Sequence, residues 1–221
     1  MIKNISLALL LSIITLSNSI ASPTEELVKL LIKEASVKNL IVTSEETTTI
    51  NNVKEIKKQT IYFQDINNYS GIADNDAVYL YKGDVYVHNI DKNVLIIFTK
   101  KQFDELIFSQ FGPIDLKENP NAQFINENFS DVSKSEKDGT IQFTLIPKSK
   151  DVPMKTLTVI YNTSKPEFGL DMIYEGKDGT ILESKTTSIK ENQSVANKIK
   201  PPVNLPNIQI VDQRKLFELE L

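Results

Sequence analysis

The chain has 221 residues, a formal net charge of −4 at pH 7, and neither cysteine nor tryptophan. An acidic chain has no electrostatic basis for binding nucleic acid. The lack of cysteine excludes disulfides, a thiol nucleophile, a thiolate metal site and acylation of this chain itself as a lipoprotein. Arg214 is the only arginine. The chain therefore has only one guanidinium group with which to bind a phosphate or carboxylate through two hydrogen bonds.

The first 21 residues have the pattern of a secretory signal. Lys3 supplies a positive charge, residues 5–16 form a short apolar run, and Ser19 and Ala21 are small residues at the cleavage positions. The run is shorter than the ~20 residues that span a membrane. We therefore predict a signal peptide at residues 1–21, cleavage near Ala21, and export to the periplasm.

Residues 22–221 are predicted to form a single domain. About 200 residues are ample for one hydrophobic core, and no interior linker rich in proline, glycine and serine divides them. The net charge of this part is −5, because Lys3 leaves with the signal and the signal contains no acidic residue.

Two helices are expected from capping patterns and apolar spacing. Ser22-Pro23-Thr24-Glu25 fits a capping box with proline at the first helical position, and the helix should end near Lys38. Thr99 and Gln102 form a second capping box, and Gly112-Pro113 should end that helix. The second helix is strongly apolar along one face, which contains Phe103, Leu106, Ile107 and Phe111 and is widened by Phe108.

The remaining pattern is that of β-strands. Alternating or continuous apolar runs predict strands at 41–50, 58–65, 78–81, 85–89, 94–98, 140–146, 154–162, 168–175, 180–189 and 208–211. Lys82-Gly83-Asp84 and two Asp-Gly pairs, at 138–139 and 178–179, are hairpin signals. The order of elements predicts an α+β, mostly β fold. It is an incomplete, half-open antiparallel β-barrel whose helices form a lid over an apolar concave face.

Catalytic constellations are missing from the sequence. His88 has no Gly-x-Ser-x-Gly or His-Glu-x-x-His context, so it is interpreted as a surface or strand-edge imidazole. Acidic pairs such as Glu45-Glu46 have no distinctive spacing, and the seven glycines form no phosphate-binding loop. We therefore expect no enzyme, no cofactor and no metal site. A hydrolase that uses His88 with carboxylates is the catalytic alternative.

Several short segments resemble one known family. Residues 143–148, 155–159 and 178–181 look like consecutive strands of the LolA-type outer-membrane lipoprotein carriers. Pro201-Pro202, followed by residues 210–215, looks like the closing segment of that family, and residues 78–101 are similar to a hairpin region in its first half. Each motif is short, and their order together with the signal carries the resemblance over nearly all of the mature chain.

The resemblance implies a monomeric periplasmic carrier that shields the acyl chains of lipoproteins. Such a carrier receives lipoproteins from an ATP-driven release complex in the inner membrane and delivers them to an outer-membrane acceptor, without a cofactor. The alternative is a carrier of another lipid or apolar ligand on the same fold. Apolar residues of the second helix and of the later strands are the candidates for the acyl-chain cavity and its lid: Phe103, Leu106, Ile107, Phe111, Phe143, Leu145, Leu157, Val159 and Met172. Alternation alone does not say which strand face points inward.

One departure from the family concerns the lid. Its members place an arginine on an early strand, where it hydrogen-bonds the lid, but residues 41–77 contain no arginine here. Lys57 or Lys58 could substitute, although a lysine lacks the planar fork of a guanidinium. The lid is therefore expected to be held by apolar contacts from Phe103 to Phe111. The tail, residues 216–221, extends beyond the resemblance and has no assigned role.

Overall fold

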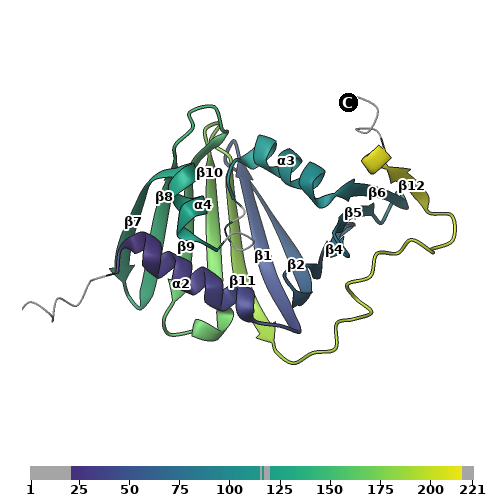
Figure 1. Ribbon diagram of the computed structural model, residues 1–221, viewed down its shortest axis with the longest axis horizontal. Coiled ribbons are helices and arrows are strands. Elements are labelled where there is room, and N and C mark those ends of the chain that lie inside the picture. Colours follow the sequence, from purple (N-terminus) through teal and green to yellow (C-terminus); the bar gives the residue numbers. More distant parts are fainter. Residues whose placement is uncertain (1–20, 115, 117–119, 216–221) are drawn as a thin grey trace, which may run out of the picture.

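A computed structural model describes residues 21–114, 116 and 120–215. The predicted signal peptide, apart from Ala21, and the tail at 216–221 lie outside the described residues. Twelve strands form one open sheet in the order β12-β6-β5-β4-β3-β2-β1-β11-β10-β9-β8-β7 (Figure 1). Neighbouring strands are antiparallel, except that β12 runs parallel to β6.

The described helices are α2 (Pro23–Ser36), α3 (Lys100–Phe111) and α4 (Ala122–Asn128), with short 3-10 turns η2 (Pro166–Phe168) and η3 (Gln213–Lys215). The first six strands are β1 (Leu40–Ile50), β2 (Val53–Asp65), β3 (Asn68–Ala73), β4 (Asp76–Tyr81), β5 (Asp84–Asn89) and β6 (Val94–Thr99). The others are β7 (Phe129–Lys137), β8 (Thr140–Pro147), β9 (Met154–Asn162), β10 (Leu170–Gly176), β11 (Ile181–Lys190) and β12 (Gln209–Asp212). The predicted fold class, a mostly β, half-open barrel with helices as a lid, is confirmed.

Both predicted helix starts are confirmed by their capping boxes. The Glu25 backbone N–H donates to Ser22 Oγ at 3.2 Å, and the Ser22 N–H donates to Glu25 Oε2 at 2.8 Å. At α3 the Gln102 N–H donates to Thr99 Oγ1 at 3.2 Å, and the Thr99 N–H donates to Gln102 Oε1 at 2.9 Å. Each box satisfies N–H groups that have no partner inside the helix. α2 ends at Ser36, two residues before the predicted end.

Three elements were not predicted, each for a local reason. β3 is short and contains Gly71, which weakens a strand pattern. β7 is an edge strand rich in serine and charge, as edges that avoid further pairing tend to be. α4 has seven residues, too few to show a helical period, although Asn121 caps it by accepting from the Phe124 N–H at 2.7 Å.

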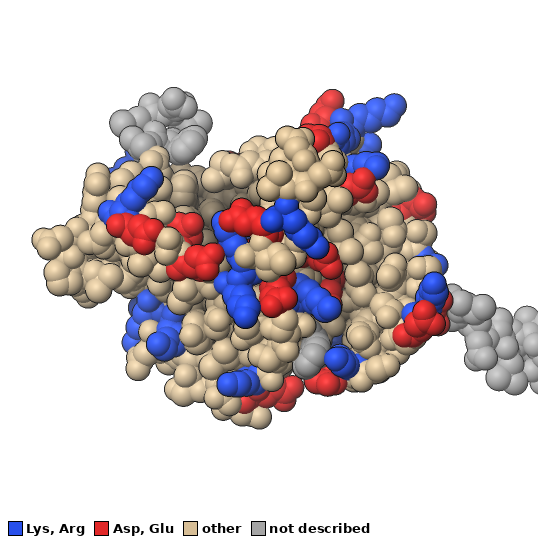
Figure 2. Space-filling model, turned by 180° about the vertical axis from the view of Figure 1, so that it is seen from behind, with Lys and Arg blue, Asp and Glu red and all other residues tan. Residues whose placement is uncertain are grey.

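The outer face of the central strands faces solvent. Glu45 on β1 lies opposite Lys58 of β2 and Lys185 of β11, so opposite charges are paired across three strands. Figure 2 shows acidic and basic side chains intermingled over the back of the molecule. The helices α2, α3 and α4 lie on the other side of the sheet (Figure 1), so the concave face is the covered one.

A long segment after β11 returns along the sheet to β12 (Figure 1). Ser70 Oγ of β3 donates to the Lys198 carbonyl at 2.9 Å, and Val195 and Ile199 are buried. Residues 191–208 therefore cover part of the outer face and bring β12 beside β6. Within the described part of the chain, no helix is long and apolar enough to cross a membrane.

Candidate functional site: a cavity beneath helix α3

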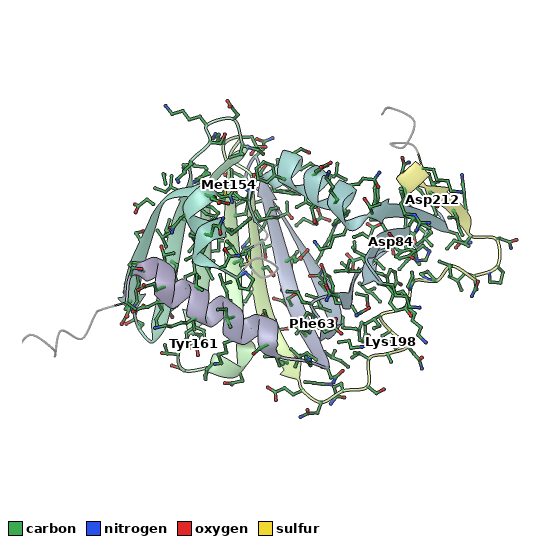
Figure 3. The ribbon with its side chains drawn as sticks, in the orientation of Figure 1. Phe63, Asp84, Met154, Tyr161, Lys198 and Asp212 are labelled. Atoms are coloured by element: carbon green, nitrogen blue, oxygen red, sulfur yellow. The ribbon has the colours of Figure 1, made fainter. Side chains whose placement is uncertain are left out.

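The covered face of the sheet is divided into a filled part and a hollow part. In the filled part, α2 and α4 lie over β7–β10, and Figure 3 labels Met154 there. The side chains of this core are at most 1% exposed at its centre: Leu27, Leu31, Ile125, Phe143, Leu145, Met154, Leu157 and Val159. Close packing of this kind leaves no room for a ligand.

The hollow part is a cavity of about 890 Å³ beneath α3. Its volume is near the upper end of the ~300–1,000 Å³ typical of small-molecule sites. The floor is made of alternate apolar residues of β1, β2, β4 and β5: Leu40, Val42, Ile61, Phe63, Leu80 and Val85. Phe103, Ile107 and Phe108 of α3 form the roof, and Met172 and Ile189 line the side towards β10 and β11. Phe63 is labelled in Figure 3 on this side of the molecule.

Strand register explains why these floor residues share one face. Leu40 lies opposite Phe63 and Val42 lies opposite Ile61, so the two strands present apolar pairs on the same side. Gly71 of β3 is the next neighbour of Ile61. Because Gly71 has no side chain, the cavity is deeper at this point. A methyl group on Gly71 would lie 3.0 Å from Gln59 Nε2.

The roof is held partly by aromatic contacts at both ends of α3. The rings of Phe103 and Phe98 lie 6.1 Å apart, and Phe111 makes an edge-to-face contact of 5.7 Å with Tyr174. No residue of α3 is fully buried. A helix over a filled core would bury its apolar stripe, so the exposure of this stripe reflects the hollow beneath it.

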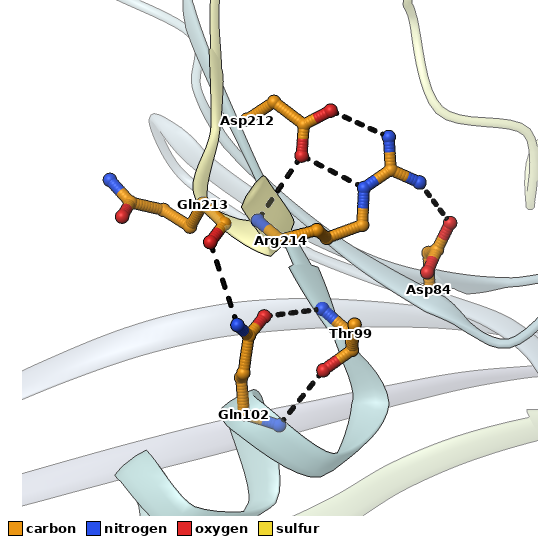
Figure 4. A network of polar contacts seen from close by, with 6 residues as sticks. All are labelled: Asp84, Thr99, Gln102, Asp212, Gln213 and Arg214. Carbon is orange, nitrogen blue, oxygen red and sulfur yellow. Dashed lines mark hydrogen bonds and ion pairs between the residues drawn. The ribbon is translucent and has the colours of Figure 1, made fainter. Parts of the chain in front are cut away.

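A polar latch joins the C-terminal segment to β5 beside the first turn of α3 (Figure 4). Arg214 donates to Asp84 Oδ2 at 2.5 Å and, through two nitrogens, to Asp212 at 2.8 and 2.7 Å. The hydrogen bonds from Arg214 lower the pKa of Asp212 to about 2. Beside this group, Gln102 Nε2 donates to the Gln213 carbonyl at 3.5 Å. The apolar contacts expected to hold α3 are present at Phe103 and Phe111, and the hydrogen bond from Gln102 adds one polar contact with the C-terminal segment.

The lysines considered as substitutes for the family arginine do not approach the lid. Lys57 Nζ lies 3.3 Å from Glu55 Oε1, and both side chains are largely exposed. Lys58 pairs across the strands with Glu45 on the outer face. The guanidinium beside the lid is that of Arg214, which comes from the other end of the chain.

One end of the cavity floor is polar. Glu46, Gln59, Ser184 and Thr186 line it, and they come from β1, β2 and β11. Burial raises the pKa of the Glu46 carboxyl, and the positive charge of Lys57 offsets part of this effect. Ser44, on the same face of β1, is 3% exposed, and its Oγ has no hydrogen-bond partner within the described part of the chain.

The predicted site residues are only partly brought together. Phe103, Ile107 and Met172 lie on the cavity wall. Leu106 is 39% exposed, and Phe111 packs against the filled core. The prediction that the remaining four line the cavity is wrong, because α2 and α4 cover their part of the sheet: Phe143, Leu145, Leu157 and Val159.

Sequence reasoning missed most of the cavity floor. The signal was present in the alternation of Leu40 with Val42 and of Ile61 with Phe63, which a hairpin pairing of the two strands would have placed together. The prediction of a surface or strand-edge position for His88 is also corrected: His88 is 5% exposed and buried. It alternates with Val85 and Val87 on β5, so it faces away from the cavity that Val85 lines.

No protein family model matches the sequence, and no curated protein matches it. An uncharacterized conserved protein from Thermus thermophilus is similar in structure, with a TM-score of 0.53, 10% identity, and coverage of 85% of this chain and 98% of that one. The LolA superfamily protein NE2245 from Nitrosomonas europaea has a TM-score of 0.41 at 10% identity, covering 79% and 97%. A putative outer membrane lipoprotein-sorting protein domain from Vibrio parahaemolyticus has a TM-score of 0.38 at 10% identity, covering 76% and 93%. At such identities the first similarity concerns the fold alone, and the other two scores are too low to carry an argument.

Proposed function

We propose that this protein is a periplasmic carrier that shields the acyl chains of lipoproteins and delivers them from the inner to the outer membrane. The observation that carries the proposal is the cavity of about 890 Å³, whose floor and roof are mainly apolar. Burial of each methylene group contributes ~0.8 kcal/mol, so an exposed acyl chain needs such a cover in water. The order of the family-like motifs in the C-terminal half is the second support.

The arrangement suits binding and transfer better than catalysis. His88 faces away from the cavity, so the hydrolase alternative would have to work without the hollow. Apolar contact is non-directional, and a ligand held by area can pass to a tighter acceptor without a covalent step. We propose that the partners are an ATP-driven release complex of the inner membrane and a lipoprotein acceptor of the outer membrane.

A carrier of another lipid or apolar ligand is the second candidate, and the polar end of the floor favours it. Acyl chains need no hydrogen-bonding groups, yet Glu46, Gln59 and Ser184 line the cavity. A lipid with a small polar head would use both kinds of surface. Native mass spectrometry of the protein isolated from its own periplasm would separate the two candidates by the mass of the ligand.

The test of the carrier proposal is release of lipoproteins from spheroplasts into soluble complexes with the purified protein. Ile61→Trp should strongly reduce release, because the larger indole projects into the cavity at the centre of the floor, beside Gly71. Lys58→Trp is the matched control on the outer face of the same strand. Thermal melts would establish that both variants fold. Absence of release by the unmodified protein would refute the delivery role.

A further inference from the structure

The polar end of the cavity contains several side chains that can hydrogen-bond a ligand. Ser44 and Glu46 alternate with Val42 along β1, and the register places Ser44 opposite both Gln59 of β2 and Thr186 of β11. Glu46 lies opposite Ser184. Hydroxyl, amide and carboxyl groups from three neighbouring strands therefore meet on the floor of one hollow, next to the apolar pairs.

Packing alone does not explain why a serine stands at position 44. Ser44 is 3% exposed and is not itself among the residues that line the cavity, but strand alternation points it to the same side of the sheet as Val42 and Glu46, which do line it. Its Oγ makes no hydrogen bond with any described residue. A buried hydroxyl without a partner costs free energy, whereas alanine at the same place would cost none. A ligand that bonds this hydroxyl would remove that cost.

The charges around the cavity limit the kind of head group. Its lining contains four acidic residues, Glu34, Glu46, Asp104 and Glu105, of which Asp104 is paired with Lys100 and Glu105 with Lys101. At the polar end of the floor, an anionic head would be repelled by Glu46. Lys57 lies opposite Glu46 across the strands and already offsets its charge, which leaves less attraction for a cationic head.

We propose that this polar subsite, made of Glu46, Gln59, Ser184 and Thr186 around the buried hydroxyl of Ser44, binds a neutral hydroxyl-bearing head group such as the glycerol of an acylglycerol, with its acyl chain on the apolar floor. The inference rests on the proposed lipid-binding function and specifies the ligand class of the same cavity. Hydroxyl groups both donate and accept, so they match a carboxylate, an amide and side-chain hydroxyls at once. The apolar pair Leu40 and Phe63 lies at the other end of the floor and would contact the chain.

The test compares four probes with the same sixteen-carbon chain: monopalmitoylglycerol, methyl palmitate, palmitate and hexadecylammonium. Dissociation constants would be measured by displacement of a fluorescent fatty-acid probe. We expect monopalmitoylglycerol to bind about tenfold more tightly than each of the others, the effect of one or two hydrogen bonds. Equal or tighter binding of methyl palmitate, palmitate or hexadecylammonium would overturn the subsite while leaving lipid binding in place.

The variant Ser44→Ala should lose most of this preference and leave the affinity for methyl palmitate unchanged. Thr47→Ala, on the opposite face of the same strand, is the matched control and should keep the preference. An equal loss for all four probes in Ser44→Ala would mean a general structural effect and would overturn the assignment. If no probe binds to the unmodified protein, the subsite and the proposed function fail together.

Discussion

Replacing a phenylalanine by alanine should lower the free energy of unfolding by different amounts in the filled part and the hollow part of the covered face. Phe143 is 0% exposed within the filled core, and Phe143→Ala should destabilise by ~3–5 kcal/mol because it opens a closed void. Phe103 lines the cavity and contacts Phe98 with ring centroids 6.1 Å apart. Phe103→Ala enlarges an existing hollow, so it should cost about 1–1.5 kcal/mol, mainly from lost transfer free energy.

Thermal unfolding followed by circular dichroism would measure both costs. For a domain of this size, 1 kcal/mol shifts the melting temperature by ~2–4 °C, so the expected decreases are about 6–20 °C for Phe143→Ala and about 2–6 °C for Phe103→Ala. Leu106→Ala, on α3 but outside the cavity, is the control and should change stability least. If Phe103→Ala costs as much as Phe143→Ala, α3 covers a packed core, and the hollow on which the function rests does not exist.

Three further predictions concern pH and turns. Asp212 has a pKa of about 2 in the folded protein, below ~3.9 in the unfolded chain, so its stabilising effect is complete above pH 4 and is lost as the pH falls towards 2. For Asp212→Asn, the free energy of unfolding measured with urea should depend less on pH between 4 and 2. If it depends on pH as strongly as in the unmodified protein, the result would contradict a stabilising latch. The pKa of Glu46 is raised in the folded protein, so Glu46→Gln should stabilise the protein at neutral pH, and its advantage should disappear on acidification as the native carboxyl becomes protonated. Melting curves should show a larger loss for Gly139→Ala than for Gly83→Ala, because both have positive φ but only at Gly139 would a methyl group meet another atom, a hydroxyl at 3.0 Å.

Helix starts and the fold class could be predicted because their causes are local. The capping boxes at Ser22 and Thr99 use side chains three residues apart, so the sequence contains the whole interaction. Strands with alternation, such as residues 154–162, were also predictable. The edge strand β7 was not, because one of its roles is to avoid pairing, and its polar residues hide the strand pattern.

The site was harder to predict because it depends on which faces are covered. Phe143 and Phe63 have similar strand contexts, but α2 and α4 pack on the first, whereas the second lines the hollow. That difference arises from the positions of the helices in space, and strand alternation does not contain it. The latch was missed for a related reason: Arg214 and Asp84 are 130 residues apart in the chain, and only β12 pairing beside β6 brings them together.

The two parts of the covered face solve a physical conflict for a chain without cysteine. A large cavity forgoes the close packing that stabilises a domain, and no disulfide is available to offset this loss. The filled core under α2 and α4 supplies stability at one end of the sheet, so the other end can stay hollow. At the hollow end, contacts on the outer side of the sheet stabilise β3, β5 and β6. They come from the segment 191–208, β12 and Arg214, and none of them takes up space in the cavity. If this division of roles is correct, Arg214→Ala should leave the filled core intact and loosen α3, which hydrogen exchange would detect as faster exchange in residues 100–111 than in residues 140–147.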